Sequence, residues 1–259
     1  MALTKVRRGG TDTGISDSSD ATAITIDSSE RVGIGITPDT TSHGKSFQIN
    51  RSVINDDDGG STHIAQNGYY NSAWKYVENG TAEKITFGLG ATTFSNATSN
   101  SSGADASLSW VNNMVIDANG IVTTPNIPCF SVTHGSQSWS GSNNEQVIAF
   151  ASEDIDNGGH FNTSNYRFTA PVAGHYFFTI HANIKAFSTS AAGGPGVFLR
   201  KNGSSSTTLF MYVYYTGYKG SSVQGIVNLA KDDYITGAAV NYNSSSFELS
   251  LRMSGFLLG

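Results

Sequence analysis

Cysteine is nearly absent from this sequence of 259 residues, in which Cys129 stands alone. A single cysteine excludes a disulfide within one chain, so covalent cross-links cannot stabilise the fold, and we expect association between chains to contribute. Long apolar runs are also missing: no stretch approaches the ~20 apolar residues of a membrane-spanning helix. The first ten residues lack the apolar core of a secretion signal. We therefore expect a protein made in a cytoplasm, without membrane insertion.

Charge is scarce as well, since Asp, Glu, Lys and Arg make up only 14% of the chain and the net charge is −5. The basic residues are scattered apart from a few near the N-terminus, which excludes the positively charged patch of a nucleic-acid-binding protein. Sustained apolar spacing at i, i+3, i+4 and i+7 is absent, whereas 29 glycines and many Ser, Thr and Asn residues are present. This composition is typical of short strands joined by turns, and it predicts an all-β protein.

Proline occurs at only five positions, and two of them mark the main boundary of the chain. Pro125 and Pro128, in TTPNIP, cannot donate to a sheet ladder and disfavour helix before them, so an extended connection is expected there. We predict an N-terminal anchoring segment over residues 1–40, a β-rich stem or small intermediate domain over residues 41–124, and a head over residues 125–259.

The clearest strand pattern lies in residues 160–185 of the predicted head. Tyr176, Phe178 and Ile180 alternate with polar residues after the corner Pro-Val-Ala-Gly, while Phe168 and Ala170 alternate before it. Side chains of a strand alternate between its two faces, so this stretch predicts two strands that share one core face.

Four motifs in this half resemble a known family. The motifs are FNTSNYRFTAPVAGHYFF (161–178), FLRKNG (198–203), VNLAKDDYI (227–235) and SFELSLRMSGFLLG (246–259). They resemble the globular head of complement component 1q and its tumour-necrosis-factor-like relatives. That resemblance implies a ten-stranded jelly roll that forms a homotrimer. The chain has Lys231, Asp232 and Asp233 where the family often has Gly-Asp, so a metal or charge role of that loop does not carry over.

Residues 209–215, LFMYVYY, are apolar on both faces of the predicted strand. One face can pack on the opposing sheet, but the other would expose a large apolar patch unless a second chain covered it. We therefore predict that Phe210, Tyr212 and Tyr214 lie in the trimer interface, together with Phe177, which breaks the alternation of its own strand.

A phrase in residues 21–38, ATAITIDSSERVGIGITP, indicates strand, turn and strand, and a related phrase recurs as MVIDANGIVTTP at residues 114–125. Two copies are too few for a solenoid. The first copy resembles a phrase of phage tail fibres and other virion appendages, in which an acidic turn and Val-Gly-Ile-Gly precede a proline.

No catalytic or metal-binding pattern stands out. Asp56, Asp57 and Asp58 lack the alternating ligands of a calcium loop, which favours a solvated turn. The acidic stretch from Glu145 to Asp156 shows no partner for a glycosidase-like pair of carboxylates, and an exposed acidic loop is the favoured interpretation. His175 and His181 are too far apart along one strand to bind the same ion. We predict no enzyme activity, no metal and no cofactor.

Four predicted loops combine small polar residues with an occasional aromatic one, a composition typical of adaptable contact surfaces. They cover residues 136–144, 188–196, 216–222 and 242–246. Trp139, Tyr218 and Tyr242 are candidates for stacking on a sugar of a receptor. The alternative is that these are solvated loops with incidental aromatics.

Together these patterns favour a trimeric virion appendage resembling a phage tail fibre. We expect assembly in a host cytoplasm, attachment to other virion proteins through residues 1–40, and binding of a host surface glycan or protein through the head. A structural fibre or capsid decoration protein without receptor binding is the alternative, and a spike that degrades surface polysaccharide is a third hypothesis.

Overall fold

The computed structural model describes residues 14–16, 22–39, 45–56, 59–139, 145–186, 195–204, 207–212, 217–242 and 246–259. These residues form strands and turns without a helix, so the all-β prediction is confirmed and the described part has no helix able to cross a membrane. The chain divides into two compact units, Met1–Pro125 and Asn126–Gly259. We call them the N-terminal unit and the head, and we describe each by itself.

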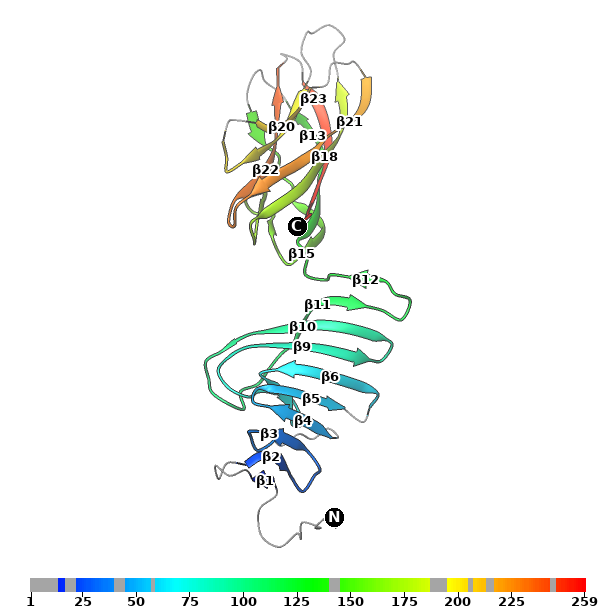
Figure 1. The fold of residues 1–259 in the computed structure, drawn as a ribbon. Helices are drawn as coiled ribbons and strands as arrows, with labels where there is room; N and C mark the ends of the chain where they lie inside the picture. The colour runs from blue at the N-terminus through cyan, green and yellow to red at the C-terminus, as the bar shows by residue number, and fades with distance from the viewer. Residues whose placement is uncertain are drawn as a thin grey trace. The chain divides into compact units, whose positions relative to one another are not determined.

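The N-terminal unit is built around one long sheet whose ten strands follow one another in chain order (Figure 1). All neighbours pair antiparallel except β3 and β4, which are parallel. The strands are β1 (Gly14–Ser16), β2 (Thr22–Ile26), β3 (Val32–Ile34), β4 (Ser46–Ile49), β5 (Ser52–Asp56), β6 (Ser61–Gln66), β9 (Gly80–Gly88), β10 (Ala91–Asn100), β11 (Val111–Ile116) and β12 (Val122–Thr123).

The pairing of β3 with β4 carries the sheet across residue 40, where we placed the end of the anchoring segment. The described strands of residues 1–40 are therefore part of the same sheet as the strands that follow. Residues 1–13, 17–21 and 40, which also belong to that segment, lie outside the described residues.

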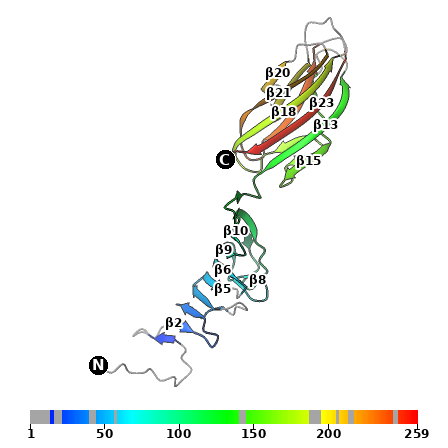
Figure 2. The ribbon, with the colours of Figure 1, turned by 90° about the vertical axis from the view of Figure 1, so that its right-hand side faces the viewer.

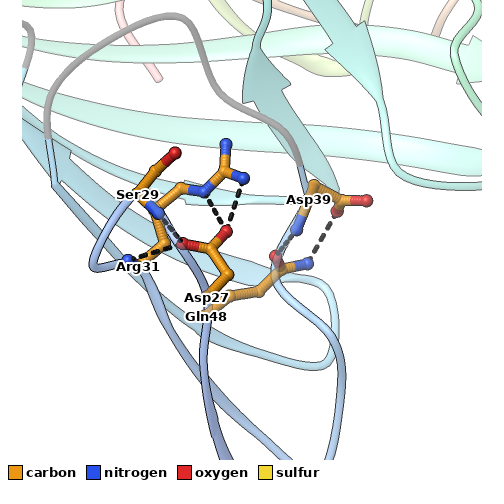
Figure 3. Close-up of polar contacts among 5 residues, drawn as sticks. All are labelled: Asp27, Ser29, Arg31, Asp39 and Gln48. Carbon is orange, nitrogen blue, oxygen red and sulfur yellow. Dashed lines mark hydrogen bonds and ion pairs between the residues drawn. The ribbon is translucent and has the colours of Figure 1, made fainter. Parts of the chain in front are cut away.

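The two related phrases form the same hairpin turn, one at each end of the sheet. Asp27 accepts hydrogen bonds from the backbone N–H groups of Ser29 and Arg31 at 2.9 and 3.0 Å, as Figure 3 shows. Asp117 makes the equivalent bonds to Asn119 and Ile121 at 2.9 and 2.8 Å. An aspartate whose side chain binds the backbone two residues ahead is a local turn device, so the sequence repeat is also a structural repeat.

At the first of these turns, the side chain of Arg31 also forms an ion pair with the Asp27 carboxylate (Figure 3). Burial opposes ionisation of Asp27, but the hydrogen bonds from Arg31 and Ser29 outweigh it and hold the pKa of this carboxyl below its usual value. Nearby, the buried Gln48 side chain of β4 exchanges two hydrogen bonds of 2.7 Å with Asp39, which fixes the segment after β3 against the sheet.

One face of this sheet is covered by the chain itself. The hairpin of β7 (Gly68–Tyr70) and β8 (Trp74–Tyr76) and the segment before β11 lie on it, and Figure 2 shows β8 beside the sheet. The Lys84 ammonium lies 4.3 and 4.8 Å from the ring centroids of Trp74 and Trp110. Burial lowers the pKa of Lys84 to about 8, while the two indole faces favour its charged form. The residues that pack together here are Trp74, Tyr76, Ala82, Ala97, Ala106, Leu108 and Trp110.

The head consists of two antiparallel sheets that enclose one apolar core. The first has the order β15-β13-β23-β18-β21, from β15 (Ser152–Asn157), β13 (Cys129–Trp139), β23 (Phe247–Leu257), β18 (Gly174–Ala186) and β21 (Gly217–Leu229). The second has the order β16-β17-β22-β19-β20, from β16 (Phe161–Asn162), β17 (Arg167–Thr169), β22 (Tyr234–Asn241), β19 (Pro195–Lys201) and β20 (Thr207–Tyr212), with β14 (Glu145–Val147) pairing β22 beside β17. Each sheet thus offers five strand positions, as the ten-stranded jelly roll requires.

The predicted core pattern of the head is confirmed. Tyr176, Phe178 and Ile180 of β18 are fully buried, as are Phe168 and the alternate residues of β23 that begin at Phe247. The rings of Phe130, Phe168 and Phe178 lie within 4.9 to 6.2 Å of one another. Because aromatic rings bury large apolar areas and pair favourably at such distances, this cluster is the centre of the head.

Candidate recognition site

The strand ends that flank the four predicted recognition loops lie at one end of the head. The chain enters this unit at Cys129, which is paired with Phe256 near the C-terminus. At the other ends of the same strands, Ala186 and Trp139 both pair with Phe247, and Pro195 pairs with Asn241. The ends of β13, β18, β20 and β22 therefore lie opposite the chain entry, at what we call the distal end. Most residues of the connections that follow these strands, including 140–144, 187–194, 213–216 and 243–245, lie outside the described residues.

Trp139 does not belong to this contact surface, and its assignment as a receptor-binding residue is wrong. It is the last residue of β13, with only 6% of its area exposed, and its ring stacks on that of Phe247 at 6.4 Å between centroids. Its carbonyl oxygen accepts a hydrogen bond of 3.3 Å from the Asn241 side chain. A ring that is buried in the head core cannot offer its face to a sugar.

The other two candidates have different surroundings. Tyr218 lies in β21, where its backbone pairs with Lys185, so it belongs to a strand and not to the loop that we expected; its side chain is outside the described part. Tyr242 directly follows β22 at the distal end and is 39% exposed. Of the three predicted aromatics, Tyr242 is thus the one whose described side chain is accessible at this end.

Phe177 points away from the core, onto the outer face of the first sheet. It pairs in register with Ile226 on one side and Phe256 on the other, and the Phe177 and Phe256 rings lie 5.5 Å apart. Ile226 is 61% exposed and Phe256 is also exposed. Three large apolar side chains therefore form a patch near the end where the chain enters. Ile226 and Phe256 are not among the predicted interface residues, although both occupy outward positions of alternating strands.

The other three predicted interface residues lie in or after β20. Phe210 is paired with Phe198 and Tyr212 with Gly196. Their side chains, and the whole of Tyr214, are outside the described part of the chain. The structure thus locates the backbone of this predicted interface at the edge of the second sheet.

The acidic residues of the head take part in structural contacts. Asp156 accepts backbone hydrogen bonds from His160 and Phe161 at 2.9 and 3.0 Å, and Asp154 lies 3.1 Å from the Arg252 guanidinium. Glu145 forms an ion pair with Arg200. Among the described residues, no three His, Cys, Asp or Glu side chains are grouped closely enough to hold a metal ion.

The Lys231–Asp233 turn is fixed by a neighbouring turn from the FLRKNG motif. The Asn202 side chain donates a hydrogen bond of 2.6 Å to Asp233 and accepts one of 2.8 Å from the backbone N–H of Tyr234. These contacts, with those of Lys201 and the Ala230 N–H, lower the pKa of Asp233 to about 2. Asp232 has a φ of 70°, a conformation that favours glycine. The FLRKNG and VNLAKDDYI motifs thus occur together because Asn202 of the first motif fixes the turn of the second.

Comparison with known proteins agrees with this architecture. The model of the C1q domain matches residues 129–258, which is half of the chain. The protein belongs to the C1q domain family. Domains of this family are generally non-enzymatic binding or structural domains.

Two solved structures are similar to the C1q domain protein. The globular domain of zebrafish complement 1qA protein is 21% identical, with a TM-score of 0.40, and the match covers 51% of this chain and 98% of that one. PRD1 vertex protein P5 is 12% identical, with a TM-score of 0.39, and the match covers 53% of this chain and all of that one. No curated protein sequence matches the chain.

Proposed function

We propose that this C1q domain protein is a phage virion appendage of the tail-fibre type. It forms a homotrimer, attaches to other virion proteins through residues 1–40, and binds a glycan or protein of the host surface through the distal end of its head. The observation that carries the proposal is the topology of the head. The strands that precede four connections rich in Ser, Gly, Asn and Tyr all end opposite the chain entry, where a particle-bound head has room for a receptor.

The patch of Phe177, Ile226 and Phe256 supports the trimer. Large apolar side chains that lie together on a surface mark an interaction site, and association between chains replaces the covalent stabilisation that a single cysteine rules out. The backbone position of Phe210 and Tyr212 at the edge of the second sheet offers a second contact surface for a neighbouring copy.

The tail-fibre assignment rests on the N-terminal phrase. Its acidic turn, fixed by Asp27, occurs again at Asp117, so the phrase is a structural element of the N-terminal unit. The location that fits these features is the virion, after assembly in the host cytoplasm. The proposal includes no cofactor, metal or nucleic acid.

The experiment measures binding of the purified full-length trimer to host cells. We expect Tyr242→Ala to weaken binding, because an exposed tyrosine face can stack on a sugar ring or pack against a protein. Three weak sites on one trimer raise the avidity by ~100-fold or more where the receptors are suitably spaced, so a modest loss per site gives a large loss of cell binding.

Tyr166→Ala is the control, since Tyr166 lies in the turn between β16 and β17, and β17 pairs with the start of β22, the end of that strand away from Tyr242. Equal binding by the Tyr242 and Tyr166 variants would move recognition away from the distal end. No binding by the wild-type trimer to its host would contradict the receptor-binding function and favour a structural or decoration protein.

A further inference from the structure

A row of apolar residues crosses the sheet of the N-terminal unit, with one residue from each of eight strands. Residues that pair directly across neighbouring strands have their side chains on the same face. The register joins eight such residues in an unbroken series, which we call the apolar row: Ile26, Val32, Phe47, Ile54, Ile64, Ile85, Phe94 and Met114.

The apolar row is open to solvent in the single chain. Ile64, near its middle, keeps 43% of its area exposed, as does its neighbour Ile54. Further apolar residues lie on the same face, two positions along the strand from members of the row. Those of β2, β3 and β4 lie on one side of the row, and those of β9, β11 and β12 lie on the other side. These are Ile24, Ile34 and Ile49, and Phe87, Ile116 and Val122.

Among the described residues of this unit, contacts within the chain cover the opposite face only. That face holds the buried Val53 and Ala65 and is covered by the β7–β8 hairpin with Trp74 and by Trp110. This sheet has one covered face and one open apolar face. Such a sheet predicts a second layer on its open face, which the described part of a single chain does not supply.

The size of the apolar face is compatible with an interface between proteins. Seven spacings of ~4.8 Å between eight strands give a length of ~34 Å, and two rows of side chains ~7 Å apart give a width of ~14 Å where the row is widened. The product is at most roughly 480 Å², more than half of the ~800 Å² that each partner contributes to a standard interface.

The charge pattern favours copies of the same chain as the occupant. Around a symmetry axis that runs along the row, each residue lies near its own copies. A charged residue there would face a like charge, but all eight members of the row are uncharged. Two acidic residues of the paired strands share this face, Asp56 and Glu83, and each lies two positions from the row and not in it. Packing of the row against its own copies therefore brings no like charges of the row together.

We propose that the apolar row packs against the same row of the other copies, so that the N-terminal units share one apolar core. The inference rests on the homotrimer of the proposed function and adds a second contact region to it, separate from the head patch of Phe177, Ile226 and Phe256.

The first test is thiol labelling of the full-length protein in a Cys129→Ser background. Ile64→Cys places a thiol on the row, and Ser102→Cys places the control thiol on an exposed residue of the segment after β10. In the purified protein at micromolar concentration, we expect iodoacetamide to label Ile64→Cys at least ~10-fold more slowly than Ser102→Cys, because burial of the apolar face excludes the reagent. Ile54→Cys serves as a second probe of the same face.

The second test compares one substitution at two exposed isoleucines. Ile64→Lys would bring like charges together on the buried row, whereas Ile121→Lys lies in the β11–β12 turn, is 57% exposed and replaces the residue equivalent to Arg31. We expect Ile64→Lys to lower the melting temperature of the N-terminal unit by ~10 °C or more, and Ile121→Lys to leave it nearly unchanged, because only the first buries an unpaired charge.

Light scattering on the same samples separates the possible failures. Multimers in which Ile64→Cys is labelled as fast as Ser102→Cys would overturn the shared core but leave the trimeric appendage intact. A monomer with a freely labelled row would overturn both the shared core and the trimer. A protected row in a trimer that does not bind host cells would support the shared core and contradict receptor binding.

Discussion

The burial of Trp139 makes a prediction that separates stability from recognition. Trp139→Ala removes a ring that is 6% exposed and stacked on Phe247. Truncation of a buried aromatic side chain to alanine typically costs ~3–5 kcal/mol, the sum of lost burial and of the cavity that remains. That is a large part of the ~5–15 kcal/mol that stabilises a typical domain. We therefore expect the head of this variant to be strongly destabilised.

Trp139→Phe is the informative control, because it keeps an aromatic ring against Phe247 and removes the indole N–H. That nitrogen is buried and has no hydrogen-bond partner among the described residues. We expect this variant to retain most of the stability and all of the cell binding of the wild type.

The measurement is denaturant unfolding at a fixed protein concentration, because the stability of an oligomer depends on concentration. Cell binding is then compared under conditions in which each variant is folded. If Trp139→Ala lost less than ~1 kcal/mol, the ring would not be a core residue and the cavity argument would fail. If Trp139→Phe stayed folded but lost binding, the assignment of Trp139 to structure alone would be wrong.

Three further predictions concern the head. The pKa of Asp233 is lowered to about 2 by the hydrogen bonds and ion pair with Asn202 and Lys201. The stabilisation by its carboxylate is therefore present above pH ~4 and lost as the pH falls toward ~2. The difference in melting temperature between wild type and Asp233→Asn should shrink to zero over that range, and a difference that stays constant would contradict the lowered pKa. Gly255→Ala places a Cβ 2.5 Å from Phe178 and should cost ~1–3 kcal/mol by overpacking, whereas Gly135→Ala, with open space around it, should be almost neutral in the same unfolding assay. Ile226→Asp should shift the trimer toward folded monomers in light scattering, because it puts a charge into the apolar patch; an unchanged trimer would place the head interface elsewhere.

The hairpin turns and the strand alternation could be predicted from sequence because both are local. A single aspartate, such as Asp27 or Asp117, binds backbone groups two and four residues ahead, so the sequence of five residues is enough to indicate the turn. Likewise, the alternation of Tyr176, Phe178 and Ile180 reveals a core face within one strand, without reference to its neighbours. The four motifs of the head were legible for the same reason, since each consists of core and turn residues.

Composition could not distinguish a loop from the end of a strand. Trp139 and Tyr218 lie among Ser and Gly residues, which are common both in loops and in strands at the edge of a protein. Whether such a residue is exposed depends on its partner across the sheet: Trp139 is buried because β13 pairs with β23 and brings Phe247 to it. A contact between residues so distant in the chain is decided by tertiary structure.

The apolar row shows the same division most clearly. From the sequence alone it follows that the N-terminal unit contains short apolar islands separated by polar stretches. That Ile54, Ile64 and Ile85 lie opposite one another is a result of folding, because register depends on how each pair of strands is connected. A shift of one residue in any strand would turn its side chains to the other face and interrupt the row, so a continuous apolar face is a property of the folded sheet and not of any segment within it.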